Sequence, residues 1–162
     1  MRTADIVERE ASAYLLVPRK VTIPFGAQID AAMGELFGTM EAHGIQPLGP
    51  VFFKYDVIRM PELEMGFGIL VAAGTPAVGS LRAGELPAGR YVRHLHVGPY
   101  DELIDATGWV LHWAQERGLE LEKVDRADGE HFASRFEMYL TDPAEQPDPA
   151  KHETEIWMKL RD

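Results

Sequence analysis

Apolar residues recur along this chain with two periods, one near 3.6 residues and one of two residues. The first period is typical of an amphipathic helix and the second of a half-buried strand. Helical spacing occurs in residues 28–44 and 99–118, and each segment closes on a glycine, as helices often do. Strands are predicted over residues 13–23, 49–58, 63–72, 90–98, 131–140 and 152–160.

The order strand, helix, strand, strand therefore occurs twice. Repeat 1 covers about residues 10–73 and repeat 2 about residues 90–162. Between them lies a connector rich in Gly, Pro and Ala, about residues 74–89, which could hold a short strand near residues 78–81. The halves match in pattern rather than in residues. We predict a single α+β domain, residues 1–162, of two tandem β-α-β-β repeats whose antiparallel sheets form a ligand cleft.

Glu137 lies inside an apolar run that is predicted to be a strand. Burying a carboxylate is costly unless it is paired or put to use, so the face that Glu137 occupies matters. Alternation places Phe136 and Met138 on one face of the strand. Arg135, Glu137 and Tyr139 share the other face. From spacing alone, Glu137 could also be a solvated residue of a half-exposed sheet.

The last predicted strand has the same mixture of faces. Ile156 and Met158 share an aliphatic face, and Trp157 lies on the opposite face between Glu155 and Lys159. We expect the aliphatic faces of both strands to lie under the helices, and the mixed faces to meet in a cleft. A carboxylate beside aromatic rings suits a flat or cationic organic molecule, for which it is a counter-charge or a general base.

Composition and charge exclude several classes of protein. The chain has 26 acidic and 16 basic residues, a net charge of −10, which argues against direct nucleic-acid binding. The absence of cysteine excludes disulfides, zinc–thiolate sites and thiol catalysis. No secretory signal and no run of about 20 apolar residues is present, so we expect a cytoplasmic protein without a membrane span. No motif supports serine hydrolysis, phosphoryl transfer or hydride transfer.

Two histidines raise the question of a metal. His94 and His96 alternate on one strand, but a third ligand is not apparent, although Glu130, His131 or Glu137 could converge on them. We predict no metal, no haem and no other cofactor, and a polar or cleft-lining role for His96.

Three further features allow two interpretations each. Trp113, on the second helix, could be core or cleft wall. Gly66 and Gly68 share a strand face and either leave room for a ligand or mark a close backbone approach or a bulge. The proline-rich loop at residues 141–153 is a connector or a lid over the cleft.

The segments "YVRHLHVGPYDEL", "FEMYLTDPAE" and "PDPAKHETEIWMKL", with "GPVFFKYD" and "MGFGILV" before them, resemble the GyrI-like small-molecule-binding domain. This is also the effector-binding domain of AraC-type and MerR-type multidrug regulators. The resemblance implies a pseudo-twofold axis between the repeats and an acidic residue in the cleft that meets cationic, aromatic ligands. Glu137 and Tyr139 match its E-x-Y motif, Tyr100 matches the tyrosine of GPY, and Tyr55 matches an aromatic residue of the first half.

Three functions are compatible with the resemblance. The leading prediction is a stand-alone protein that binds a hydrophobic, aromatic and cationic small molecule. The alternatives are a hydrolase of strained cyclopropane-bearing electrophiles, with Glu137 as base and Tyr139 as its partner, and a gyrase-inhibitor-like interaction module. A homodimer remains open. The predicted ligand-binding residues are Glu137, Tyr139, Trp157, Tyr55, Tyr100, Phe53, Phe67, Trp113 and His96.

Overall fold

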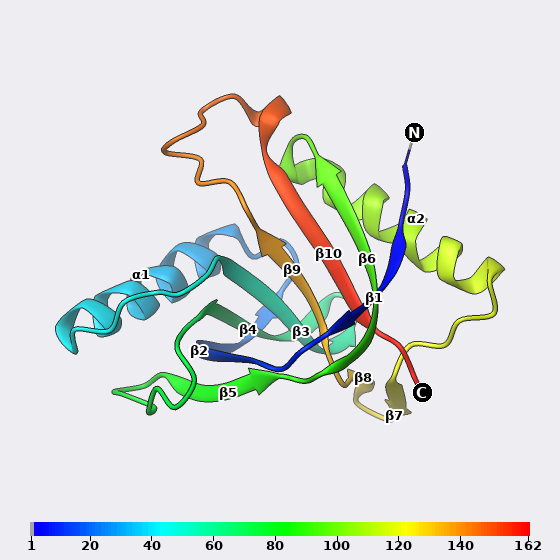
Figure 1. Ribbon diagram of the computed structural model, residues 1–162. Coiled ribbons are helices and arrows are strands. Elements are labelled where there is room, and N and C mark those ends of the chain that lie inside the picture. Colours follow the sequence, from blue (N-terminus) through cyan, green and yellow to red (C-terminus); the bar gives the residue numbers. More distant parts are fainter. Residues whose placement is uncertain (1) are drawn as a thin grey trace.

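The computed structural model describes residues 2–162, which form one strongly curled antiparallel sheet with helices on one side (Figure 1). The strand order is β1-β6-β10-β9-β3-β4-β2-β5, and a β7–β8 hairpin extends from β3. The strands are β1 (Asp5–Arg9), β2 (Ser12–Thr22), β3 (Val51–Arg59), β4 (Glu62–Leu70), β5 (Arg82–Leu86), β6 (Gly89–Val97), β7 (Lys123–Arg126), β8 (Gly129–Phe132), β9 (Arg135–Tyr139) and β10 (Glu153–Lys159). The helices are α1 (Gly26–Ala42) and α2 (Leu103–Glu116), with short 3₁₀ turns η1 (Tyr100–Glu102) and η2 (Pro149–Lys151).

The two halves of the chain contribute their strands in the same spatial order. The first half runs β2-α1-β3-β4 and is arranged β3-β4-β2, and the second runs β6-α2-β9-β10 and is arranged β9-β10-β6. The halves meet where β3 pairs with β9, a register that places Phe53 opposite Glu137. At the two ends of the strand order, β1 pairs with β6 and β5 pairs with β2. The N-terminal segment, which holds β1 and β2, therefore connects both halves. The predicted α+β class and antiparallel sheet are confirmed.

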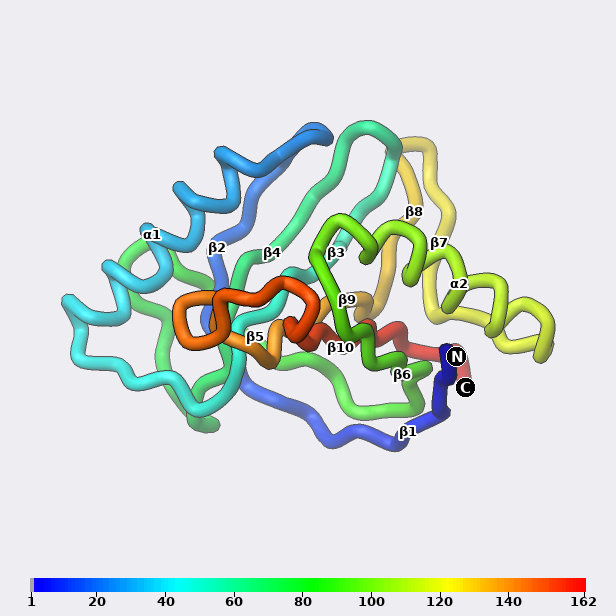
Figure 2. Tube along the Cα trace, turned by 90° about the horizontal axis from the view of Figure 1, so that it is seen from above, coloured from blue at the N-terminus to red at the C-terminus, as the bar shows by residue number. Residues whose placement is uncertain are grey.

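Both helices lie on the same side of the sheet and stand apart from each other (Figure 2). Under α1, Leu36 and Met40 pack against buried residues of β2 and β4 such as Val17. Under α2, Val110 packs against Ile156 and neighbouring residues of β10 and β6. Each helix packs its apolar stripe against the strands of its own half. The strands at the centre of the sheet therefore lie below the space between the two helices.

A third cluster occupies the opposite face of the sheet, away from the helices. Phe52, Tyr91, Phe136 and Trp157 are its largest members. We expected Phe136 and Met138 to lie under the helices, and this expectation is wrong, because the curled sheet encloses a core of its own on the concave side. Apolar side chains therefore lie on both faces of β3 and β10.

Gly66 and Gly68 belong to this enclosed face rather than to ligand space. A Cβ atom at Gly68 would lie 2.7 Å from Cζ of Phe52 and 2.9 Å from the carbonyl oxygen of Leu15. At Gly66 it would lie 2.7 Å from a methyl group of Leu16. Of the predicted alternatives, close packing against the neighbouring strand is therefore correct.

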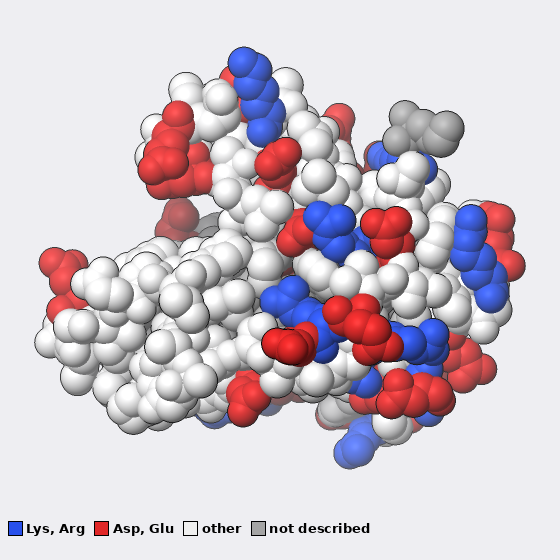
Figure 3. All heavy atoms as spheres, in the orientation of Figure 1, with Lys and Arg blue, Asp and Glu red and all other residues white. Residues whose placement is uncertain are grey.

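Some strands were missed or misplaced by the sequence analysis. The short strand considered near residues 78–81 is not present, and the connector instead holds β5 at Arg82–Leu86. β1 and β5 are short and carry charged residues, which in β1 lie on the face shown in Figure 3, so neither gives a clean apolar alternation. The segment predicted as one strand over 131–140 is divided between β8 and β9. No helix within residues 2–162 has the length and apolar character needed to span a membrane.

Candidate functional site

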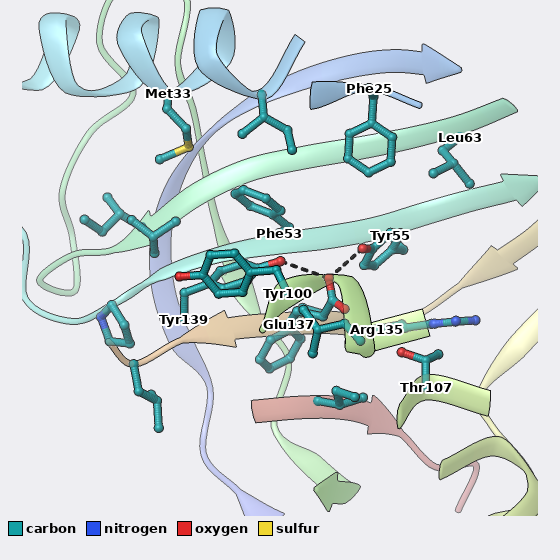
Figure 4. Close-up of a pocket in the computed structure, with 18 of the residues that line it drawn as sticks. Phe25, Met33, Phe53, Tyr55, Leu63, Tyr100, Thr107, Arg135, Glu137 and Tyr139 are labelled. Carbon is teal, nitrogen blue, oxygen red and sulfur yellow. Dashed lines mark hydrogen bonds between the residues drawn. The ribbon is translucent and has the colours of Figure 1, made fainter. Parts of the chain in front are cut away.

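A cleft of about 960 Å³ lies between the two helices, above the strands at the centre of the sheet (Figure 4). Its volume lies within the range of about 300–1,000 Å³ that is usual for small-molecule sites. Ile29 and Met33 of α1 form one wall, and Leu103 and Thr107 of α2 form the other. The lining is mostly apolar, and its charged residues are Arg135, Glu137 and Asp142.

Glu137 is the central polar group of this cleft. Its side chain is 7% exposed, and its Oε1 accepts hydrogen bonds from the hydroxyl groups of Tyr55 at 2.6 Å and Tyr139 at 3.0 Å (Figure 4). Among residues 2–162, no donor bonds Oε2 of Glu137. One carboxylate oxygen is therefore held by the protein, while the other is left for a molecule that enters the cleft.

The strand register explains why these groups meet. Phe53 lies opposite Glu137 across the β3–β9 pair, and Tyr55 is two residues further along β3, on the same face. Tyr139 is two residues after Glu137 on β9, and its ring centroid is 4.6 Å from that of Phe53. Tyr100, on η1, contacts the ring of Tyr139, with a centroid distance of 5.6 Å. Aromatic side chains from both halves thus surround one carboxylate.

Burial raises the pKa of Glu137 above its ordinary value, because the charged form loses its hydration. The hydrogen bonds from Tyr55 and Tyr139, and the charge of Arg135, oppose this rise. Burial and the neighbouring carboxylate raise the pKa of both tyrosine hydroxyl groups well above the usual range. Both tyrosines therefore stay protonated and act as donors throughout the physiological pH range.

We expect Glu137→Gln to become more stable relative to the wild-type protein as the pH rises. The folded state binds the proton of Glu137 more tightly than the unfolded chain, whose Glu pKa is about 4.3. The wild-type protein therefore loses stability as the pH rises from that value through the folded pKa, and the variant lacks this loss. Urea unfolding of both proteins across this pH interval measures the difference.

The matched control for this prediction is Glu35→Gln. A hydrogen bond from Ser80, and then Arg19, lowers the pKa of Glu35, so its substitution should give a dependence of opposite sign. A Glu137→Gln variant that loses stability relative to wild type with rising pH would contradict the burial argument.

The structure separates the predicted ligand-binding residues into two groups. Glu137, Tyr139, Tyr55, Tyr100 and Phe53 line the cleft. The remaining four predicted residues, Phe67, Trp113, His96 and Trp157, are not among the residues that line it.

The residues outside the cleft have other neighbours. Phe67 is fully buried against Phe53 under α1, with ring centroids 4.9 Å apart. Trp113 packs beside the core of α2, and the guanidinium of Arg117 lies 4.0 Å from the centre of its ring. His96 is buried, with its Nε2 3.3 Å from Oε1 of Glu102.

Trp157 lies on the face of the sheet opposite to the cleft, which corrects the prediction that it shares a face with Glu137. In the β9–β10 register, Ile156 pairs with Glu137, whereas Trp157 pairs with Phe136. The cleft face of β10 is therefore its aliphatic face, and Ile156 and Met158 contribute to the lining.

The histidines do not form a metal centre with the residues considered above. Nδ1 of His94 lies 2.7 Å from the carbonyl oxygen of Thr3, and His131 pairs with Asp128 at the surface. Within residues 2–162, no three side chains of the types that hold metals come together.

Sequence analysis missed several contributors to the cleft. Ile29 and Met33 belong to the apolar stripe that predicted α1, and we did not assign them to the cleft. Thr107 was not predicted either, because a single hydroxyl group within an amphipathic helix does not indicate a binding site. The loop at residues 141–153, which we predicted as a connector or a lid, borders the cleft through Asp142, next to Leu140. At the end of this loop, His152 stacks on Tyr100 at a centroid distance of 5.2 Å.

The chain belongs to the family of GyrI-like small-molecule-binding domains, whose model matches residues 3–161. Comparison of the sequence with curated proteins gave no match. The protein is therefore a small-molecule-binding domain by family.

Solved structures share the fold. The C-terminal domain of EcmrR is 18% identical, with a TM-score of 0.76 over 99% of this chain and 98% of that one. In a complex of EcmrR with DNA, at 20% identity and a TM-score of 0.77, 99% of this chain matches only 57% of the EcmrR chain. SAV2435 bound to tetraphenylphosphonium is 11% identical, with a TM-score of 0.64 over 98% of this chain and 94% of that one. A hydrolase from Listeria innocua is 17% identical, with a TM-score of 0.65 over 99% and 92%.

Proposed function

We propose that this protein binds hydrophobic, aromatic and cationic small molecules in the cleft between its helices. The observation that carries the proposal is the buried carboxylate of Glu137, whose Oε2 faces an apolar, aromatic cavity without a donor from residues 2–162. A cation supplies the missing partner, and the rings of Tyr139, Tyr100 and Phe53 stack on its aromatic groups.

The structure of SAV2435 with tetraphenylphosphonium supports this choice of ligand class, since that cation combines a delocalised charge with four apolar rings. In an apolar cleft a carboxylate attracts such a cation more strongly than it would in water. The same burial that raises the pKa of Glu137 therefore favours a bound positive charge.

Titration with tetraphenylphosphonium, followed by tryptophan fluorescence or calorimetry, tests the proposal. We expect saturable binding to the wild-type protein and a loss of about 10- to 100-fold in affinity for Glu137→Gln, as for removal of one buried charged partner. Glu120→Gln removes the same charge from an exposed position, with a side chain that is 77% exposed, and should bind as the wild type does. Equal affinity of Glu137→Gln and wild type would contradict the role of the carboxylate.

A second candidate function, hydrolysis, is favoured by the same free oxygen. In this reaction a water molecule gives a proton to Oε2 of Glu137 while its oxygen bonds to a carbon of the strained cyclopropane and the ring C–C bond breaks. The electron pair of that bond passes into the electron-withdrawing group conjugated to the ring, which then takes up the proton from Glu137. Mass spectrometry after incubation with cyclopropane-bearing electrophiles separates the two functions. A product heavier by one water, formed by the wild type and not by Glu137→Gln, would identify a hydrolase, whereas unchanged ligand would identify a binding protein.

A further inference from the structure

Arg135 is a second charged group inside the cleft, and no side chain within residues 2–162 bonds directly to its guanidinium. It precedes Glu137 by two residues on β9, and both side chains line the cavity. Among residues 2–162, its guanidinium takes part in no hydrogen bond and no salt bridge. Its neighbours are rings: its central carbon lies 5.8 Å from the ring centre of Tyr55 and 4.9 Å from that of Phe132.

Neither acidic group near Arg135 bonds to its guanidinium. Oε1 of Glu137 accepts two tyrosine hydrogen bonds, while within residues 2–162 its Oε2 has no donor. Oε2 of Glu130 forms a salt bridge with Nζ of Lys123 at 2.9 Å. Ring stacking holds the plane of a guanidinium but leaves free the N–H groups along its edge. Burial lowers the pKa of Arg135, although an arginine remains protonated at neutral pH. The group therefore keeps its charge and unused N–H donors.

Thr107 places a hydroxyl group at the same end of the cleft. It lies in the middle of α2 and lines the cavity, and within residues 2–162 its hydroxyl makes no hydrogen bond. Figure 4 shows Arg135 and Thr107 at one end, Tyr100 and Tyr139 at the other, and Glu137 between them. The polarity of the cleft thus changes along its length, from aromatic rings through a carboxylate to unpaired donors.

We propose that Arg135 and Thr107 form a subsite for an anionic or hydrogen-bond-accepting group of the ligand. This inference rests on the proposed function, because it concerns the same cleft, and it narrows the ligand class. A simple cation that pairs with Glu137 is repelled by Arg135 in a medium of low polarity. A zwitterion, an aromatic cation that carries a carboxylate, satisfies both charges. The preferred ligands are therefore zwitterionic aromatic molecules.

Rhodamine B and its ethyl ester test this subsite, because they share one cationic ring system and differ in the free carboxylate. Fluorescence anisotropy gives the affinity of each dye. We expect the wild-type protein to prefer rhodamine B. Arg135→Met should lower the affinity for rhodamine B by about 10- to 100-fold, as for loss of a charged hydrogen-bond partner. Its affinity for the ester should be unchanged or higher.

Two further variants complete the design. Arg135→Lys keeps the charge and should retain part of the preference for rhodamine B. Thr107→Val keeps the shape of the side chain without its hydroxyl. It should lower the affinity for rhodamine B by about 2- to 10-fold and leave the affinity for the ester unchanged. Thr107→Val also tests the subsite independently if Arg135→Met does not fold.

The outcomes separate this inference from the proposed function. An equal loss for both dyes in Arg135→Met, or no loss for either, would overturn the subsite. If the ester binds in a manner that depends on Glu137 while the Arg135 and Thr107 variants show no selectivity, the proposed function stands and the subsite is wrong. If neither dye binds the wild-type protein, both proposals fail.

Discussion

Replacing Tyr55 and Tyr139 together by phenylalanine should remove most of the cation binding at neutral pH. Both hydroxyl groups donate to Oε1 of Glu137, at 2.6 Å and 3.0 Å. A hydrogen bond to a charged group stabilises it by about 1.5–3 kcal/mol, so the double variant leaves the charge of Arg135 as the main influence that offsets the desolvation of the carboxylate. The equilibrium of Glu137 then shifts toward its protonated form, and the cleft loses negative charge. We expect a loss of about 100-fold in affinity for tetraphenylphosphonium near pH 7.

The pH dependence identifies the cause of this loss. A carboxyl group is ionised above its pKa, so the affinity of the wild-type protein for a cation should rise as the pH passes through the raised pKa of Glu137. Removing the two hydroxyl groups raises that pKa further, and the same increase in affinity should appear at higher pH. Titrations at intervals from about pH 5 to about pH 9 measure both curves. Each single variant should give an intermediate curve.

Tyr100→Phe is the matched control, because Tyr100 lines the cleft without a hydrogen bond to Glu137. It should lose little affinity and keep the pH dependence of the wild type. A double variant that binds as weakly at high pH as at pH 7 would indicate damage to the cleft rather than a change in ionisation. Wild-type affinity in the double variant at every pH would show that the tyrosines do not control the charge of Glu137.

Alternation along single strands was sufficient to predict part of the site. Glu137 and Tyr139 share a face because they are two residues apart on β9, and Phe53 and Tyr55 share a face of β3 for the same reason. The resemblance to the GyrI-like domain assigned Tyr55 to the cleft and added Tyr100, which lies on a different element. These five residues are the ones that the structure brings together at the cleft.

The pairing between strands could not be predicted in this way. Whether Trp157 or Ile156 shares the face of Glu137 depends on the β9–β10 register, and a shift of one residue moves every side chain to the other face. We matched the two strands by the composition of their faces, which assumes that only one face is apolar. The curled sheet has apolar side chains on both faces, so this assumption failed.

The helix residues that line the cleft could not be distinguished from core residues by their spacing. Ile29 and Met33 follow the same apolar stripe as the core residues Leu36 and Met40 of α1, yet the first two line the cleft. A stripe has the same period whether it covers a core or faces a cavity, since both require apolar side chains. The division between core and cleft arises from the position of the second helix, which is a property of the tertiary fold.

Trp157→Ala should be among the most destabilising single changes in this protein, at about 3–5 kcal/mol. The side chain is 5% exposed, and its ring stacks on Phe136 at a centroid distance of 6.1 Å and meets the edge of Tyr91 at 5.8 Å. The guanidinium carbon of Arg9 lies 4.7 Å from the ring centre, and Nε1 of Trp157 donates to Glu155 at 3.3 Å. Removing the ring leaves a large cavity and takes from Arg9 the nearer of its two aromatic neighbours, since its guanidinium carbon lies 5.4 Å from the ring centre of Phe136.

Equilibrium urea unfolding measures this loss, and Trp113→Ala is the matched comparison. Trp113 is half-buried at the side of α2, so its removal should cost less than that of Trp157. Equal losses for the two variants would contradict the role of the enclosed cluster as a core.

Trp157→Phe tests the complementary claim that the ring does not serve the cleft. Phenylalanine fills most of the space, so the protein should fold, and its affinity for tetraphenylphosphonium should stay within about twofold of the wild type. A loss of about tenfold or more would mean that this face of the sheet contributes to binding. The expected pair of results, a large change in stability from Trp157→Ala and an unchanged affinity from Trp157→Phe, follows from one structural fact. The sheet separates its aromatic cluster from the face that borders the cleft, so the packing on one face can offset the cost of the buried carboxylate on the other.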